Sequence, residues 1–129
     1  MTRRAISTTN APSAVGPYSQ AITTHDLVFC SGQVGLDPAT GELVSGGLEA
    51  QVERVIHNLE AVLDAAGCTL ADVTKTTCFL ADINDFASFN AIYGRFFPAP
   101  QPARSTFAVR ALPKNALVEI EAIAVRGGD

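Results

Sequence analysis

The segment Val118–Val125 limits the fold most strongly, because it reads as a strand that is apolar on both faces apart from two carboxylates. Period-two alternation puts one set of side chains on one face: Val118, Ile120, Ala122 and Ala124. The opposite face carries Glu119, Glu121, Ile123 and Val125. Neither face is a plain solvent face, so we expect at least one glutamate to lie where a charge is costly.

Apolar periodicity divides the rest of the chain into strands and two helices. Segments of period two, rich in β-branched residues, predict strands at 18–23, 27–34, 73–80 and 103–109, with a short one at Leu43-Val44. The first two form a hairpin across the turn at 24–26. The element order is therefore β-β-(β)-α-β-α-β-β.

Two segments have helical periodicity. An apolar stripe predicts a helix from Leu48 to Ala66, which Gly67 ends as a C-cap. A second helix starts after Asn84 or Asp85 and breaks at Pro98. It directs aromatic side chains inward: Phe86, Phe89, Tyr93, Phe96 and Phe97.

This element order predicts a single α+β domain over residues 1–129. Two helices cover only one face of such a sheet, whereas the closing strand is apolar on both faces. Other copies of the chain would cover the second face most economically. We therefore expect an obligate small oligomer.

Composition narrows the class of protein. Hydrophobic residues make up 47% and charged residues 17%, which is typical of a globular chain with some surface covered by a partner. A net charge of −4 without a basic run argues against nucleic acid as a partner. Three cysteines without CxxC spacing favour free thiols in a reducing compartment. With no apolar run of about 20 residues and no signal peptide, we expect a cytoplasmic protein away from the membrane.

Metal and cofactor chemistry has little support in the sequence. The two histidines, His25 and His57, have no partner at i+4 and no cysteine cluster nearby. No nucleophile elbow and no glycine-rich phosphate loop are present. We expect neither a metal nor a cofactor.

Arg104 and the two glutamates are the main candidates for chemistry. Arg104, about one hairpin before the last strand, offers a planar fork for a substrate carboxylate, although an ion pair with one glutamate explains it equally well. Glu119 and Glu121 lie about 7 Å apart on one face of the strand. In a partly desolvated site one of them titrates high and serves as a general acid and base. The alternative is that one is solvated and the other is salt-bridged.

Four further residues accompany them. Ser31-Gly32 interrupts an apolar strand, and a glycine there often marks the close approach of a ligand or another backbone. Asn90 interrupts the inward face of the second helix, where its amide needs partners. Tyr18 either lines a pocket or packs. Together these residues point to one pocket for a carboxylate-bearing substrate and a water.

Several short motifs, in order along nearly the whole chain, resemble the RidA (YjgF/L-PSP) family. They are Asn10-Ala11-Pro12, Gly16-Pro17-Tyr18-Ser19-Gln20, Ser31-Gly32-Gln33, Asn84-Asp85-Phe86, Pro102-Ala103-Arg104-Ser105 and Glu119-Ile120-Glu121-Ala122. The resemblance implies a chorismate-mutase-like α+β fold with two helices on one face of the sheet. It also implies a homotrimer with sites in clefts between subunits.

The activity that the resemblance implies is the hydrolysis of enamines and imines released by pyridoxal-phosphate enzymes, such as 2-aminoacrylate, to a 2-keto acid and ammonia. Arg104 would bind the substrate carboxylate, and Glu119 would activate the water and assist proton transfer. Tyr18, Ser31, Gly32 and Asn90 would shape the pocket, with Gly32 and Thr106 using main-chain groups. Many relatives carry cysteine where this chain has Thr106, so a thiol there is not the nucleophile.

Two other functions remain open at this point. The first is an endoribonuclease, a label that some family members carry, although the charge of −4 and the lack of a histidine pair count against it. The second is a trimer that binds 2-keto acids or other metabolites without catalysis, using the same cleft and Arg104.

Overall fold

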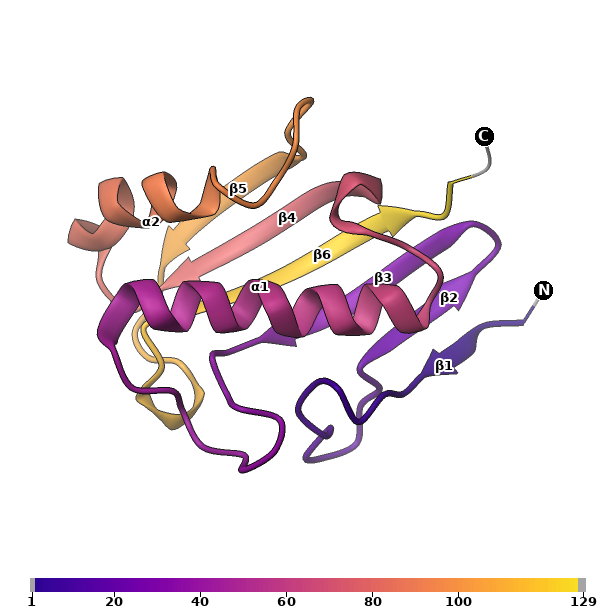
Figure 1. Cartoon of the computed structure of the whole chain (residues 1–129), viewed down its shortest axis with the longest axis horizontal. Coiled ribbons are helices and arrows are strands. Elements are labelled where there is room, and N and C mark those ends of the chain that lie inside the picture. The colour runs from indigo at the N-terminus through magenta and orange to yellow at the C-terminus, as the bar shows by residue number, and fades with distance from the viewer. Residues whose placement is uncertain (1, 128–129) are drawn as a thin grey trace.

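The computed structural model describes residues 2–127, which form a mixed sheet with two α-helices on one face (Figure 1). The strands are β1 (Arg4–Ile6), β2 (Ala21–Thr24), β3 (Leu27–Gln33), β4 (Val73–Leu80), β5 (Ala103–Ala108) and β6 (Val118–Val125). The helices are α1 (Gly47–Ala65) and α2 (Phe86–Tyr93), and short 3-10 turns occur at Leu70–Asp72, Ile83–Asp85 and Pro113–Asn115.

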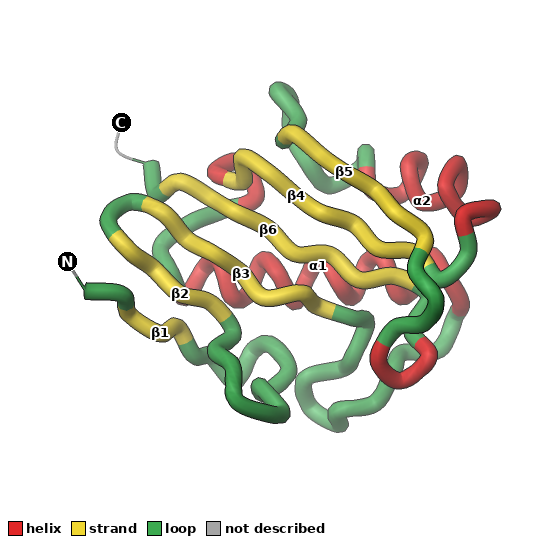
Figure 2. The backbone as a smooth tube through the Cα atoms, turned by 180° about the vertical axis from the view of Figure 1, so that it is seen from behind, coloured by secondary structure: helices red, strands yellow, loops and turns green. Residues whose placement is uncertain are grey.

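The strand order across the sheet is β1-β2-β3-β6-β4-β5, visible from behind in Figure 2. All neighbours are antiparallel except β4 and β5, which are parallel because α2 crosses over between them. The last strand therefore lies between β3 and β4 at the centre of the sheet. The expectation that β5 and β6 are neighbouring strands of a hairpin is wrong, because β4 separates them.

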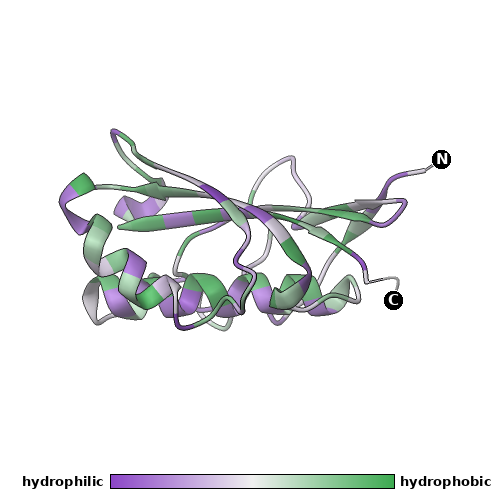
Figure 3. Ribbon diagram, turned by 90° about the horizontal axis from the view of Figure 1, so that it is seen from above, coloured by the Kyte–Doolittle hydropathy of each residue, from purple (hydrophilic) through white to green (hydrophobic). Residues whose placement is uncertain are grey.

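Both helices pack on the same face, as the edge-on view in Figure 3 shows. The predicted stripe of α1 is buried there, with Val55, Ile56 and Leu59 fully inaccessible to solvent. The helix ends one residue earlier than predicted: its last residue is Ala65, and Ala66 rather than Gly67 is the C-cap. Gly67 follows with φ 82°, a conformation that glycine adopts without strain. Burial of this stripe against the sheet forms the core.

The opposite face of the sheet is uncovered and partly apolar. The alternation predicted for β6 is confirmed, since Val118, Ile120, Ala122 and Ala124 are buried under the helices. Large apolar side chains remain 37–53% exposed on three strands of the sheet: Leu27, Phe29, Phe107 and Val125. The register places them on the face that carries Glu119. We call this the open face.

Several local expectations need correction. β1 was not predicted, the first hairpin strand begins at Ala21 rather than residue 18, and Leu43 forms only a single bridge to Leu36. α2 ends at Tyr93, and the chain continues in turns up to residue 96. Asp85 is its N-cap but makes no side-chain capping bond, and Phe86 remains 37% exposed rather than buried in the core.

The chemistry expected of the cysteines is confirmed in part. Cys30, Cys68 and Cys78 are all free and buried. Burial raises the pKa of Cys30 to about 12 and that of Cys78 to about 11, so both remain thiols near neutral pH. No helix within residues 2–127 is long and apolar enough to cross a bilayer.

Candidate functional site

A cleft of about 650 Å³ opens on the Glu119 side of the sheet. Its walls come from the loop before β2, from β3, from β6 and from the turn Pro113–Asn115. The residues that matter below are Tyr18, Ser31, Gly32, Lys114, Glu119 and Glu121. The strand pattern explains the two carboxylates, because Glu119 and Glu121 are the outward members of the β6 alternation.

The carboxylate of Glu119 lies directly over Gly32. A Cβ atom at position 32 would sit 2.9 Å from Cδ of Glu119 and would overlap its Oε2. Gly32 is therefore a steric requirement of the site, as expected for close approach in a strand. A shift in the β3–β6 register between Cys30 and Gln33 brings the two residues together.

Burial in this position raises the pKa of Glu119 above its ordinary value of 4.5. The nearby charge of Glu121 raises the pKa of Glu119 further, as a smaller second cause. Glu119 therefore has the raised pKa that we expected of one of the two glutamates. A carboxyl group of this kind is suited to give and take protons.

Hydrogen bonds to the main chain fix the loop that carries Tyr18. The hydroxyl of Ser31 donates to the carbonyl of Ser19 at 2.6 Å. The buried side chain of Gln20 accepts from the N–H of Thr8 at 2.7 Å and donates to the carbonyl of Pro12 at 2.7 Å. Ser31 therefore holds the wall of the cleft in place, and Gln20 has a structural part in the motif.

Arg104 lies on the other face of the sheet. In the parallel pair it stands opposite Thr76, whose side chain is buried on the helix-covered side. Glu119 stands opposite Phe79 on β4, in the alternate set of side chains. Arg104 and Glu119 are therefore on opposite faces of one chain, and they do not share a pocket within it.

The guanidinium of Arg104 is surrounded by aromatic rings rather than carboxylates. Its Cζ lies 4.9 Å from the ring centroid of Tyr93, 5.6 Å from that of Phe89 and 5.7 Å from that of Phe86. Among residues 2–127 no carboxylate forms an ion pair with it. The alternative of an ion pair with Glu119 or Glu121 is therefore wrong within one chain, because Arg104 lies on the opposite face from both.

Asn90 and Thr106 accompany Arg104 on the helix-covered side. Asn90 lies on α2, and Thr106 lies two residues after Arg104 on β5. The Oδ1 atom of Asn90 and the Oγ1 atom of Thr106 are buried and have no hydrogen-bond partner among the described residues. Buried polar atoms without partners are rare, and they often mark a place that a ligand, a water or another chain completes.

The residues expected to form one pocket thus form two groups. Tyr18, Ser31 and Gly32 gather with Glu119 in the cleft, whereas Asn90, Arg104 and Thr106 gather beneath α2. Sequence alternation identified the two glutamates on one face of β6. It could not show that β5 pairs with β4 rather than with β6, in a register that turns Arg104 to the opposite face.

Lys114 is a lining residue that the sequence analysis did not single out. It adopts φ 57°, and its Nζ donates to the carbonyl of Gly41 at 3.1 Å. This bond joins the loop before β6 to the loop after β3 at one wall of the cleft. No group of three or more His, Cys, Asp or Glu side chains within residues 2–127 is arranged to hold a metal ion.

Residues 8–126 match the family model described as Endoribonuclease L-PSP. The chain belongs to this family. The resemblance to the RidA (YjgF/L-PSP) family drawn from the motifs is therefore confirmed. The human protein named 2-iminobutanoate/2-iminopropanoate deaminase is 49% identical over 125 residues, which cover 97% of this chain and 91% of the relative.

Solved structures of the L-PSP family have the same fold. A Thermotoga maritima protein superposes with a TM-score of 0.93 at 49% identity, covering 97% of this chain and 98% of that one. RidA from an Antarctic Psychrobacter superposes with a TM-score of 0.91 at 45% identity, covering 95% and 98%. These matches confirm the α+β fold with two helices on one face of a mixed sheet.

Proposed function

We propose that the protein is a deaminase that hydrolyses 2-imino acids, and the enamines that tautomerise to them, to 2-keto acids and ammonia. The observation that carries this proposal is Glu119, a half-buried carboxyl group of raised pKa lying over Gly32 in an open cleft. The name of the human relative, 2-iminobutanoate/2-iminopropanoate deaminase, supports the same reaction for a chain 49% identical to it.

The reaction needs only a positioned water and a proton carrier. Ionised Glu119 accepts a proton from the water as its oxygen bonds to C2 of the imine. The protonated carboxyl group returns that proton to nitrogen, which gives a tetrahedral carbinolamine. Glu119 then takes the proton of the new hydroxyl group and delivers it to the amino nitrogen; as the C2–N bond breaks, ammonia leaves, the C2=O bond of the keto acid forms and the carboxylate is regenerated. Because imines are electrophilic, holding the water and substrate in contact supplies much of the acceleration.

Arg104 would bind the substrate carboxylate, provided that a second copy of the chain brings it to the cleft. Its planar fork matches a carboxylate in a bidentate pair, and no described carboxylate occupies it. Since Arg104 and Glu119 lie on opposite faces, one copy would supply the arginine and its neighbour the glutamate. Asn90 and Thr106 would complete the arginine side, and Tyr18 and Gly32 the glutamate side.

The open face supports such an assembly. It exposes apolar side chains from the central and edge strands, whereas interfaces between permanent subunits bury surfaces of this kind. β5, which carries Arg104, is an edge strand, so a neighbouring copy can approach it. We propose a homotrimer, the assembly that the family resemblance implies.

A coupled assay tests the reaction. A pyridoxal-phosphate serine dehydratase supplies 2-aminoacrylate, and the conversion to pyruvate is followed with the wild-type protein, Arg104→Ala and Glu119→Gln. We expect acceleration by the wild type and its loss in both variants, with Arg110→Ala, on the exposed loop after β5, as the charge-matched control. Keto-acid binding without any acceleration would instead favour the metabolite-binding function.

A second experiment tests the assembly. Phe29→Glu puts a charge on the open face, whereas Ala71→Glu adds the same charge on an exposed turn away from it. We expect light scattering to show a trimer for the wild type and for Ala71→Glu. Phe29→Glu should give smaller species without activity. A trimeric and active Phe29→Glu protein would argue against the open face as the interface.

The ribonuclease function has no comparable support in the geometry. His25 lies in the β2–β3 turn, and His57 lies on α1, where its Nδ1 pairs with Glu60 at 2.8 Å. The two imidazoles therefore lie on separate elements rather than in a pair that could transfer protons on RNA. RNA cleavage that survives purification and persists in Glu119→Gln would nevertheless favour this function.

A further inference from the structure

We propose that Tyr93 is a positioning residue for Arg104: its ring holds the guanidinium ready for a carboxylate. This inference rests on the proposed function, because it assumes that Arg104 binds the substrate carboxylate. Tyr93 is the nearest of the three rings, with its centroid 4.9 Å from Cζ of Arg104. Attraction between a guanidinium and the face of an aromatic ring at this distance favours the charged group at that place.

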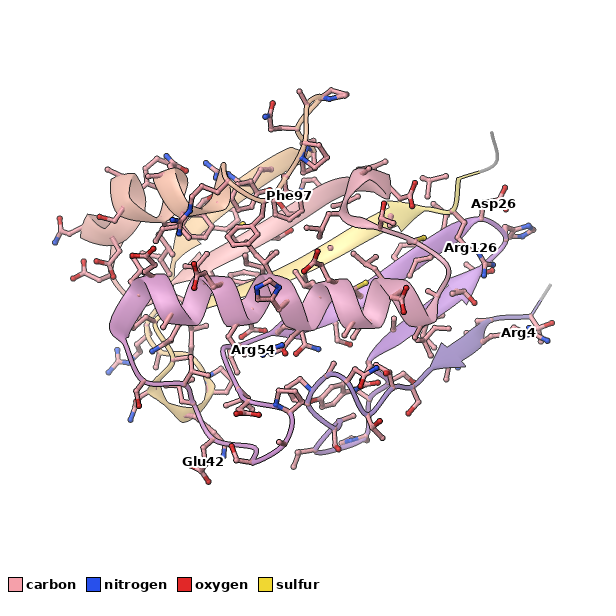
Figure 4. All side chains as sticks on the ribbon, viewed as in Figure 1. Arg4, Asp26, Glu42, Arg54, Phe97 and Arg126 are labelled. Carbon is pink, nitrogen blue, oxygen red and sulfur yellow. The ribbon has the colours of Figure 1, made fainter. Side chains whose placement is uncertain are left out.

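The ring of Tyr93 is itself fixed from two further directions. Its hydroxyl shares a 2.7 Å hydrogen bond with the hydroxyl of Thr76, in buried surroundings. The ring also stacks with that of Phe97, with ring centroids 4.5 Å apart and planes inclined by 28°. Phe97 follows α2 in the chain and is labelled in Figure 4. A ring held at its edge and on a face has little freedom to turn away from Arg104.

The register of the sheet connects Thr76, Tyr93 and Arg104 to one another. Thr76 on β4 is the residue directly opposite Arg104 on β5. The hydroxyl of Tyr93 is thus anchored one strand away, at the level where the arginine side chain leaves the sheet. Any displacement of the ring along the strands would lengthen its bond to Thr76.

Aromatic contacts of this kind matter because no charged partner holds Arg104 among residues 2–127. A carboxylate neighbour would fix the guanidinium equally well, but it would also neutralise the group and compete with the substrate. Aromatic faces orient the cation without neutralising it. Fixing the side chain before binding also reduces the conformational entropy that binding must remove.

The test separates the ring from its hydroxyl. Tyr93→Leu removes the aromatic face, whereas Tyr93→Phe keeps it and loses only the bond to Thr76. Phe96→Leu is the matched control, because Phe96 follows α2 and packs against the core, while its ring neither stacks with Tyr93 nor lies over Arg104. Each variant is assayed for KM and kcat with an imino acid, and for pyruvate binding by calorimetry.

We expect Tyr93→Leu to raise KM and the pyruvate Kd about tenfold, with kcat nearly unchanged because Glu119 and the water are untouched. Tyr93→Phe should raise KM and the pyruvate Kd by less than about threefold, because it keeps the aromatic face that the leucine variant lacks. Phe96→Leu should lower the melting temperature but leave the Kd close to that of the wild type. A merely structural role of Tyr93 would instead raise the Kd in Phe96→Leu and Tyr93→Leu alike.

Two results would overturn the inference: an unchanged Kd in Tyr93→Leu, or an equal loss of binding in Phe96→Leu. If Tyr93→Leu fails to fold, Tyr93→Met removes the aromatic face with a more adaptable side chain, and an unchanged Kd in that variant would also count against the inference. Arg104→Lys distinguishes a failure of the role proposed for Arg104 from a failure of the role proposed for Tyr93. Unweakened pyruvate binding there refutes the proposed role of Arg104, whereas weakened binding there with none in Tyr93→Leu refutes only the role of Tyr93.

Discussion

Replacing Gly32 by alanine should abolish most activity while leaving the fold intact. The new Cβ would lie 2.9 Å from Cδ and 3.1 Å from Cγ of Glu119 and would overlap its Oε2. Since carbon atoms in contact are separated by about 3.5–4.0 Å, the carboxylate must retreat by roughly 1 Å. A displacement of about 1 Å at a reacting group costs on the order of a hundredfold in rate.

The free energy of unfolding should change much less. The atoms that must move are the end of a flexible side chain beside an open cleft, so the penalty lies at the low end for overpacking, about 1 kcal/mol. We would measure kcat/KM in the coupled assay and stability by urea unfolding on the same preparations. Gly127→Ala is the control, because its Cβ would meet Asp72 at an ordinary 3.4 Å.

A double-mutant cycle locates the effect. If the alanine acts by moving Glu119, then adding Gly32→Ala to Glu119→Gln should cost no further activity, because the displaced group is already inactive. Full activity in Gly32→Ala would refute the steric reasoning. Equal losses in the presence and absence of the Glu119 carboxylate would show that the substitution acts elsewhere.

Three further predictions follow from burial and charge. The acid limb of the pH profile of kcat/KM should lie above the ordinary glutamate pKa of 4.5, because Glu119 has a raised pKa and must be ionised to accept a proton. Glu121→Gln removes a neighbouring negative charge and should therefore shift that limb to lower pH. Cys30 and Cys78, with pKa values of about 12 and 11, should react with a disulfide reagent near neutral pH only after unfolding, and fast labelling of the native protein would contradict their burial. Leu59→Ala, at a fully buried position, should lower the free energy of unfolding by about 2–5 kcal/mol in urea titrations, and a loss well below this would mean that the core collapses around the gap.

Much of the fold follows from periodicity alone. The β6 alternation and the stripe of α1 were readable because a long element buried on one side repeats its pattern several times. β1 was not readable, because Arg4-Ala5-Ile6 is too short to repeat, and it is a strand only because it pairs with β2. The early end of α2 likewise depends on how the turns after Tyr93 pack, which no local pattern specifies.

The residues of the candidate site could be selected from the sequence, but their placement on the two faces of the sheet could not. Glu119 and Arg104 were recognised by residue type, and the raised pKa was expected of one glutamate without showing which. Their separation depends on the parallel pairing of β4 with β5, a long-range contact that closeness in sequence obscures. The aromatic surroundings of Arg104 come from α2, whose aromatic residues the sequence analysis assigned only to the inward face of the helix.

The position of Arg104 and Glu119 on opposite faces of one sheet has a genetic consequence. If neighbouring copies share each site, a cell producing both an Arg104-deficient and a Glu119-deficient chain would regain activity that neither allele provides alone. Random mixing in equal amounts would leave about a quarter of the sites with both groups intact. The two lesions would then complement each other within a single gene, whereas two lesions on the same side of the sheet would not.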